Sequence, residues 1–433
     1  MTKEDIIEAA FKVWGRDLYR TTSLTQIAGE LGVSKPALYR HFKDKDSLLD
    51  AMYSAYFDDF AEFNKKGFDK AVNAPSRKEA DLIIVRTFAE YYIRNRDAFI
   101  FSLIQVYNSR IRKNTIQEMA LRGFNFDLLA REKDPFYPPQ MQLIMATVVF
   151  SIAEFHQRSV RTGEIHQRSV IKAAPRAAAD VTNETVERVL SGIEARICKG
   201  LRLDGKTIAA LDYEALEKRA AGTVWDSNEV NALLRAVAEA VAEAGPWDAS
   251  MEMVAKRSGL SKSGLYAHFK SRLDMLSQMF VTEFTRMANL AKAQIESSTV
   301  PEEQLYLGIM SIAGYLRSRP EILVALDWIK TRRFEGLGKE IPGHLFRIIG
   351  SIKLEAIQSY DKNMLVEIAQ WIIFMTINNL VWWPSGRKSC PAMEPEQPDM
   401  SINWAKSIIE EVPNESFRIL FRFIALGLEG IDQ

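Results

Sequence analysis

The sequence predicts an all-α protein built from two similar halves. Prolines and glycines are few for a chain of 433 residues, 15 and 22 respectively, which is typical of helices joined by short connections. One twelve-residue stretch also occurs twice, as "GVSKPALYRHFK" at residues 32–43 and as "GLSKSGLYAHFK" at residues 259–270. Because a chain of this length exceeds one ordinary core, two or more domains are expected.

The composition excludes several classes of protein. A formal net charge of zero excludes a uniformly basic nucleic-acid coat but leaves local basic patches open. The two cysteines, Cys198 and Cys390, are too few for a disulfide framework and indicate a reducing cytosol. The charged first residues lack the apolar core of a signal peptide. The richest apolar stretch, residues 371–383, is too short to cross a bilayer. We therefore expect a cytoplasmic protein without a membrane partner.

The repetition covers whole halves of the chain. Residues 24–49 and 251–276 align without gaps and share ten identities in 26 positions. Weaker likenesses pair residues 92–101 with 315–324, and residues 183–190 with 414–421. Since a solenoid needs more copies at a shorter period, the pattern predicts a tandem of two domains.

The first copy predicts three short helices in a row. An apolar stripe follows Thr2, which can cap the first helix. Ser23 can cap the second helix, and Gly32 can end it in the left-handed conformation. Ser34 can cap the third helix, with Pro36 in its first turn, where the missing N–H costs nothing. Two short helices with a glycine-containing turn, after an amphipathic helix, are typical of a helix-turn-helix domain.

Spacing on the third helix separates the core from an exposed side. Leu38 and Phe42 are four residues apart and are expected to pack on the first two helices. The other side offers cations, a phenol and an imidazole, which are groups that contact phosphates and base edges. Both segments are locally basic, with a net charge of +2 over residues 24–45 and +4 over residues 251–272.

We therefore predict that both copies bind double-stranded DNA. The predicted contact residues are Thr25, Ser34, Lys35, Pro36, Ala37, Tyr39, Arg40, His41, Lys43 and Lys45 in the first copy, and Ser261, Lys262, Ser263, Gly264, Tyr266, Ala267, His268, Lys270 and Arg272 in the second. For any single residue, core packing or an ordinary solvated surface is a competing explanation. Their joint occurrence, twice, favours DNA binding.

Residues 23–48 resemble the DNA-binding signature of the TetR family of bacterial regulators. The resemblance lies in Ser23, Ile27-Ala28, Gly32-Val33-Ser34, Leu38-Tyr39, His41-Phe42, Lys45 and Leu48, and in Ser250, Val254-Ala255, Gly259-Leu260-Ser261, Leu265-Tyr266 and His268-Phe269 of the second copy. The second copy departs from the signature at Arg272, Met275 and Gly264. A glycine inside this short helix weakens it by up to about 1 kcal/mol.

The resemblance implies a helix-turn-helix domain followed by a helical regulatory domain in each half. The predicted segments are residues 1–46 (first DNA-binding domain), 47–204 (first ligand-binding and dimerisation domain), 205–225 (linker), 226–273 (second DNA-binding domain) and 274–433 (second ligand-binding and dimerisation domain). Family members pair as homodimers through a four-helix bundle. Here the bundle candidates are residues 140–160, 183–201, 361–383 and 414–430, long and apolar as a bundle requires.

Pairing of the two halves within one chain would make an intramolecular pseudo-dimer, and further dimerisation of that unit stays open. The resemblance also implies that an effector moves the helices joined to the two heads, residues 47–65 and 274–292. The effector is unknown, and the aromatic content favours an apolar or aromatic molecule. Its candidate contacts are Phe88, Tyr91, Tyr92, Phe101 and Tyr107 in the first half, and Tyr306, Tyr315 and Trp328 in the second. Ordinary core packing is the commoner role of such residues.

The two heads differ at positions expected to read bases. Arg40 corresponds to Ala267, and an arginine can take guanine edges that an alanine cannot. We therefore expect a regulator that reads two non-identical half-sites, and the family resemblance implies that it is a repressor. The alternative is that only the first head works and the second half is a structural or interaction module. An enzyme is the least expected class, because no HExxH, CxxC, phosphate loop or nucleophile elbow occurs. No catalytic residue, metal or cofactor is predicted.

Overall fold

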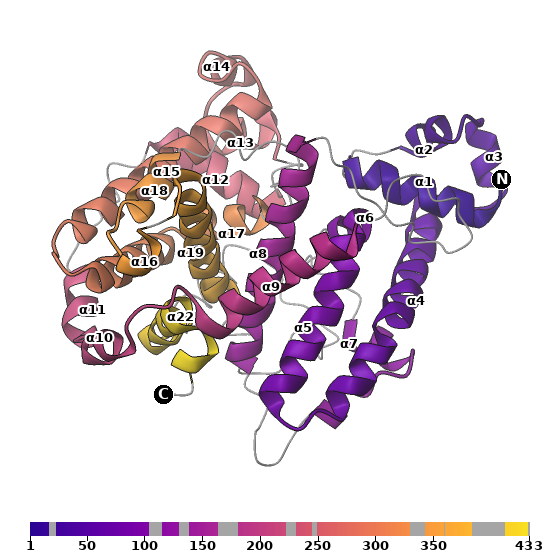
Figure 1. Ribbon diagram of the computed structural model, residues 1–433. Helices are drawn as coiled ribbons and strands as arrows, with labels where there is room; N and C mark the ends of the chain where they lie inside the picture. Colours follow the sequence, from indigo (N-terminus) through magenta and orange to yellow (C-terminus); the bar gives the residue numbers. More distant parts are fainter. Residues whose placement is uncertain are drawn as a thin grey trace. The chain divides into compact units, whose positions relative to one another are not determined.

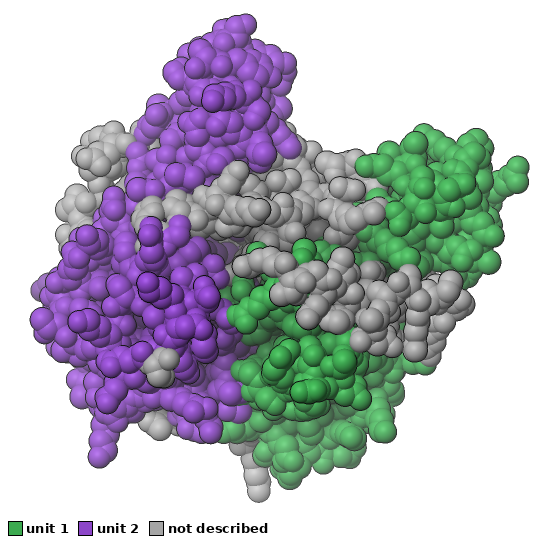
Figure 2. All heavy atoms as spheres, turned by 45° about the horizontal axis from the view of Figure 1, so that its top comes forward, with its two compact units in different colours: residues 1–137, 148–194, 389–397 green, residues 138–147, 195–388, 398–433 purple. Residues whose placement is uncertain are grey.

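The computed structural model is drawn in Figure 1. It describes residues 1–16, 23–103, 115–129, 138–162, 181–221, 231–244, 249–329, 343–358, 360–382 and 412–431. Every regular element within these ranges is a helix, which confirms the all-α class. The chain divides into two compact units, coloured separately in Figure 2. The first unit comprises residues 1–137, 148–194 and 389–397, and the second residues 138–147, 195–388 and 398–433.

The first head is a three-helix domain as predicted. Its helices are α1 (Lys3–Arg16), α2 (Leu24–Glu30) and α3 (Lys35–Tyr39). Thr2 and Asp5 cap α1 reciprocally, since each backbone N–H donates to the other side chain, at 2.7 and 3.2 Å. Ser23 forms the same kind of box with Gln26 at the start of α2. Gly32 follows α2 with φ of +65°, the left-handed conformation that favours glycine.

The remainder of the first unit is built around the long helix that leaves the head. Its helices are α4 (Lys45–Val72), α5 (Arg77–Arg94), α6 (Arg96–Phe101), α7 (Thr115–Ala120), a 3-10 turn (Phe126–Leu129), and parts of α8 (Pro138–Thr162) and α9 (Asn183–Lys199). Aromatic side chains fill the space between α4, α5 and α6. Phe101 of α6 lies 5.1 Å from Phe11 of α1 and 5.3 Å from Tyr53 of α4. The head is therefore packed directly on the core of its own unit.

The second unit repeats this order of elements. Its helices are α10 (Gly205–Ala210), α11 (Tyr213–Ala221), α12 (Ala232–Ala244), α13 (Met251–Ser258), α14 (Lys262–Tyr266), α15 (Arg272–Ile295), α16 (Pro301–Ser318), α17 (Pro320–Ile329), α18 (Gly343–Gly350), α19 (Lys362–Trp382) and α22 (Asn414–Leu426), with 3-10 turns at Glu355–Ile357 and Gly427–Gly430. Helix α17 packs on α12 as α6 packs on α1.

One pair of polar contacts occurs in both units and shows that the duplication extends beyond the heads. Arg94 donates to Oδ1 of Asn183 at 2.8 Å and to the carbonyl two residues before it at 3.0 Å. Arg317 donates to Oδ1 of Asn414 at 2.9 Å and to the carbonyl two residues before it at 2.8 Å. These residues occupy matching places in the weaker repeats. The same arginine clamp therefore ties the last helix to the middle helix in each half.

Most of the predicted linker, residues 205–225, is folded. Helix α11 packs on α16, and the ring of Tyr213 lies 5.1 Å from that of Tyr306. Glu217 accepts hydrogen bonds from Arg418 at 2.7 and 3.0 Å and from the hydroxyl of Tyr306 at 2.7 Å. Burial alone would raise the pKa of Glu217, but these donors together hold it below its ordinary value. The polar composition that indicated a linker belongs to the exposed face of a docked helix.

Within the second unit, segments from the two sequence halves lie against each other. Leu201 and Leu203, just after α9, donate backbone hydrogen bonds to Ile424 and Ala425 of α22, at 2.8 and 3.0 Å. Farther along the unit, the indole N–H of Trp371 in α19 donates to Thr147 of α8 at 3.4 Å. The first half thus supplies part of the core that covers α19 and α22.

Helix α19 is the one helix, among the described residues, that is long and apolar enough to cross a membrane. The candidate span is Lys362–Val381, longer than the stretch considered from the sequence, and 61% of its most apolar window is buried inside the protein. Trp371 and Met375 are fully buried. A buried core helix has the same composition, so this helix is weak evidence for a membrane.

Candidate DNA-binding interface

The third helix of each head is held by the two apolar residues that the spacing indicated. Leu38 and Phe42 are 1% and 6% exposed, and their counterparts Leu265 and Phe269 are 0% and 2% exposed. The prediction that these side chains face the core is confirmed. Tyr39 and Tyr266 lie on the other side, 46% and 50% exposed.

The predicted contact residues gather on the exposed sides of the two heads. Exposed side chains are Thr25, Ser34, Lys35, Pro36, Tyr39, Arg40, Lys43, Ser261, Lys262, Ser263, Tyr266, Ala267, His268 and Lys270, and half-buried ones are Ala37, His41, Lys45, Gly264 and Arg272. Burial lowers the pKa of Lys45, which begins α4. Their contact with DNA stays a prediction, and none of them is buried in the core.

The caps of the two third helices differ, which the sequence did not indicate. Ser34 stands at the N-cap of α3 but makes no side-chain cap hydrogen bond. Ser261 caps α14, because the backbone N–H of Gly264 donates to its Oγ at 3.0 Å. A Cβ at position 264 would lie 3.2 Å from that oxygen, tighter than ordinary contacts. Gly264 therefore weakens the helix by its own flexibility but gives room for the cap.

Both heads are capped at the start of the long helix that follows, with the two residue types exchanged. Asp44 accepts from the N–H of Ser47 at 2.7 Å, and the N–H of Asp44 donates to Ser47 Oγ at 3.1 Å. In the second head the N–H of Asp274 donates to Ser271 Oγ at 3.1 Å. Hydrogen bonds from the backbone hold the pKa of Asp44 below its ordinary value. These caps fix the direction in which α4 and α15 leave the heads.

The cations of the third helices have different partners. The ammonium group of Lys35 lies 5.8 Å from the ring centre of Tyr39. That of Lys262 instead forms an ion pair with Glu252 of α13. Glu252 was not among the predicted site residues. The ungapped alignment carried a signal that could have found it, because it sets this carboxylate opposite Thr25.

The aromatic residues predicted to bind an effector are buried where they are described, except for Phe88, which is half-buried. Tyr91, Tyr92 and Phe101 are at most 5% exposed, and Phe88 packs 5.0 Å from Phe60. An open hollow on α4 is lined by Glu62, Lys65, Lys66, Asp69, Lys70 and Asn73, and by none of these aromatic residues. Tyr107 and the side chain of Trp328 lie outside the described residues.

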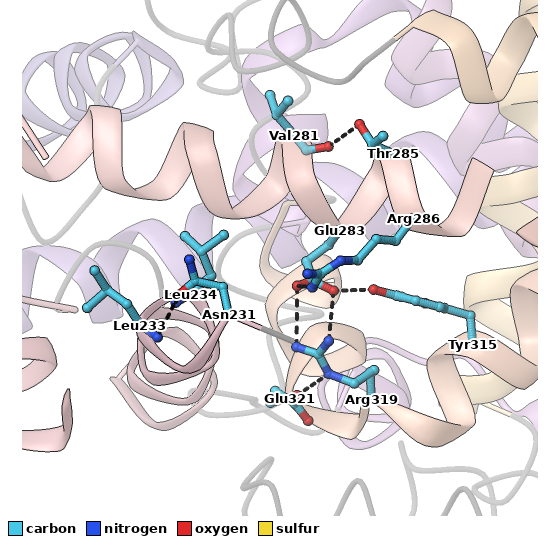
Figure 3. A network of polar contacts seen from close by, with 10 residues as sticks. All are labelled: Asn231, Leu233, Leu234, Val281, Glu283, Thr285, Arg286, Tyr315, Arg319 and Glu321. Carbon is cyan, nitrogen blue, oxygen red and sulfur yellow. Dashed lines mark hydrogen bonds and ion pairs between the residues drawn. The ribbon is translucent and has the colours of Figure 1, made fainter. Parts of the chain in front are cut away.

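The two halves place different chemistry between the head-linked helix and the middle helix. In the first unit the hydroxyls of Tyr56 and Tyr92 are 2.6 Å apart in an aromatic core. In the second unit Glu283 of α15 takes the place of Tyr56, and the hydroxyl of Tyr315 donates to it (Figure 3). Arg319 adds an ion pair to Glu283 at 3.1 Å.

This second cluster is deeply buried. Glu283 and Arg319 have side chains 1% and 3% exposed, and Arg319 also pairs with Glu321. Burial and the neighbouring Glu283 raise the pKa of Tyr315 above its ordinary value, so its hydroxyl is a donor at neutral pH. Among the described residues, no cluster of histidine, cysteine or carboxylate side chains is able to hold a metal ion.

Two basic helix-turn-helix heads with exposed third helices define a DNA-binding protein. Residues 6–52 and residues 233–279 each match the model of the tetR family of bacterial regulatory proteins. Each match spans the three helices of a head and the start of the long helix that follows. The chain therefore carries two domains in tandem that each match the DNA-binding domain of the tetR family of bacterial regulatory proteins.

A solved structure with a detectable likeness is a TetR family transcriptional regulator, PfmR, from Thermus thermophilus. It is 20% identical to this chain, and the match covers 44% of this chain and 95% of that one, with a TM-score of 0.24.

Proposed function

We propose that the protein is a ligand-responsive repressor in the cytoplasm that reads two non-identical half-sites with two recognition helices of one chain. The observation that carries this proposal is the contrast between the heads. Their buried residues are alike, whereas exposed positions of the third helix differ, as at Arg40 and Ala267. Shared scaffolds with altered exposed side chains are expected of two readers with different sequence preferences.

Pairing of the two halves within the chain would let one chain present two heads as a homodimer does. It is supported by contacts inside the second unit, where residues from both halves meet. Arg196 of α9 pairs with Glu367 of α19 at 3.2 Å and lies over the ring of Trp371 at 5.2 Å. The last helix of one half against the last helices of the other is the geometry of a paired bundle. The linkage would replace concentration-dependent dimerisation by a local concentration on the order of millimolar.

Regulation would pass through the helices that leave the heads. Helices α4 and α15 run from each head into its core, and α6 and α17 pack on the first helix of each head. A ligand that prefers one arrangement of these helices shifts the population of DNA-binding states. The aromatic core of the first unit suits an apolar or aromatic effector better than the ionic core of the second. We therefore place the effector in the first half.

Selection of DNA from a random library by the full chain tests this proposal. We expect an imperfect inverted repeat whose half-site centres are one helical turn or a multiple apart. A perfect palindrome would contradict two different readers.

The alternative, a second half that is only a structural or interaction module, is favoured by Ala267, which offers little to a base. Neutralising Lys262 and Lys270 separates the two functions. If the module interpretation holds, Lys262→Gln with Lys270→Gln leaves the salt dependence of DNA binding unchanged. If both heads bind DNA, the double variant reduces the salt slope by about two phosphate contacts.

A further inference from the structure

The second head carries an acidic side chain beside its recognition helix, and the first does not. Glu252 lies in the first turn of α13, and its carboxylate binds the ammonium group of Lys262 in the first turn of α14. Thr25 occupies the equivalent position in the first turn of α2. The difference therefore lies on the exposed side of the head that also presents the third helix.

The Glu252–Lys262 pair joins two solvent-exposed side chains. Glu252 is 61% exposed and Lys262 is 55% exposed. Their mutual hydrogen bond lowers the pKa of Glu252 and raises that of Lys262, so both stay ionised at neutral pH. An exposed pair contributes little to folding stability. Its consequence is instead a change in the charge that this surface offers to a ligand.

The equivalent lysine of the first head is available to an anion. Lys35 lies over the ring of Tyr39, and no carboxylate within the described ranges forms an ion pair with it. A hydroxyl such as that of Thr25 can donate to a phosphate oxygen. The first head thus combines a cation and a donor where the second combines a cation and an anion.

A DNA backbone that reaches the second head meets two costs that the first head lacks. A phosphate must displace the Glu252 carboxylate before Lys262 can neutralise it, and it then lies close to that negative charge. Both effects reduce the counterion release that drives sequence-independent binding. Hydrogen bonds to base edges depend on sequence, and correct ones offset these costs.

We propose that Glu252 is a specificity-determining residue that makes the second head a conditional reader of double-stranded DNA. The first head supplies the sequence-independent hold on the backbone. The second head engages only where its base contacts outweigh the repulsion from Glu252. This inference rests on the proposed function, because it requires both heads to bind DNA.

Reciprocal exchange of the two residues tests the inference in the full chain. The variants are Glu252→Thr and Thr25→Glu, with Glu355→Thr as a matched loss of an exposed carboxylate away from the heads. Affinity is measured by fluorescence anisotropy across a salt series, with a mixed-sequence duplex and with the duplex selected by the wild-type chain. Lys35→Gln and Lys262→Gln report whether each head contacts DNA at all.

Glu252→Thr is expected to tighten binding to the mixed-sequence duplex by about 3- to 10-fold and to steepen the salt slope by about one phosphate contact. Binding to the selected duplex improves less, so the ratio between the two affinities falls. Thr25→Glu weakens mixed-sequence binding by a similar factor, and Glu355→Thr changes neither quantity.

Unchanged affinity and salt slope in both exchange variants, while Lys35→Gln and Lys262→Gln weaken binding, would overturn the inference and leave the proposed function standing. If neither Lys35→Gln nor Lys262→Gln weakens DNA binding, the proposed function is overturned, and the inference with it.

Discussion

At the scale of single residues, the two heads share their buried side chains and differ in exposed ones. The third helix is held by Leu38 and Phe42 in one head and by Leu265 and Phe269 in the other. These residues were predictable because burial on a short helix follows spacing alone. The partner of Lys262 was not, since ten residues and a turn separate it from Glu252 and an exposed lysine has several possible partners.

Arg40 is the residue at which the heads are expected to differ most in sequence reading. We expect Arg40→Ala to cost about 1–3 kcal/mol of binding free energy on the selected duplex, because a bidentate contact to a base is lost. The preference at one half-site should relax while the other half-site keeps its sequence. Repeating the library selection with this variant measures the effect, and equal relaxation of both half-sites would contradict the assignment.

The caps of the third helices provide a matched pair of substitutions. Ser261→Ala removes a hydrogen bond that caps α14, whereas Ser34→Ala removes none from α3. We therefore expect Ser261→Ala to reduce the local stability of α14 by about 1 kcal/mol and Ser34→Ala to have a smaller effect on α3. Amide hydrogen exchange of the two helices in free protein measures both, and equal losses would contradict the structure.

At the scale of elements, the sequence predicted the long helices well and their surroundings less well. The bundle candidates coincide closely with α8, α9, α19 and α22, because long apolar periodic segments are the clearest signal in a sequence. Helix α11 lies in the segment that was expected to be a linker with some helix, since only Tyr213 and Leu216 mark its buried face. Tertiary contacts of Glu217 hold it in place, and composition does not encode such contacts.

A further prediction at this scale concerns the ionic cluster of Glu283, Arg319 and Glu321. Arg319→Met leaves the carboxylates of Glu283 and Glu321 buried without their main cation, so we expect a loss of about 3–5 kcal/mol in unfolding free energy. Arg286→Met is the matched control. The side chain of Arg286 is 19% exposed, and its distance to the carboxylate of Glu283, 3.4 Å, is longer than that of Arg319. Denaturant titration of both variants compares them. Equal losses would show that Arg319 is not the central partner.

The residues at the C-terminal end of α9 approach the end of α22 closely inside the second unit, at two glycines. Gly200 has φ of +52°, and a Cβ there would lie 2.4 Å from the carbonyl oxygen of Ile424. Gly427 is similar, with φ of +70° and a Cβ position 2.3 Å from the carbonyl carbon of Cys198.

Gly200→Ala is expected to cost about 2–4 kcal/mol of unfolding free energy, because strained backbone and overpacking add. Gly192→Ala, in open space on α9, should instead be neutral or stabilising by up to about 1 kcal/mol. Thermal melts of the two variants give the comparison. A stable Gly200→Ala protein would argue against this close backbone approach, and with it against pairing of the two halves.

At the scale of the whole molecule, the chain holds two heads that need not be identical. The two subunits of a symmetric homodimer carry identical recognition helices, so both subunits read the same half-site sequence. Duplication within one chain removes that constraint, so the exposed residues of the heads can change separately while the buried residues of the heads stay alike. The same freedom extends to the cores of the two units, where Tyr56 and Tyr92 in one half are matched by Glu283 and Tyr315 in the other. The alignment of the two halves contains these differences, but their meaning depends on burial, which only the structure supplies.

The most direct test of the central claim is the number of chains that occupy one operator. Light scattering of the complex with the selected duplex, combined with footprinting of that complex, gives stoichiometry and protected bases together. We predict one chain of 49.2 kDa per duplex, with two protected major-groove segments of different sequence. Two chains on one duplex, each protecting a single segment through its first head, would contradict the account.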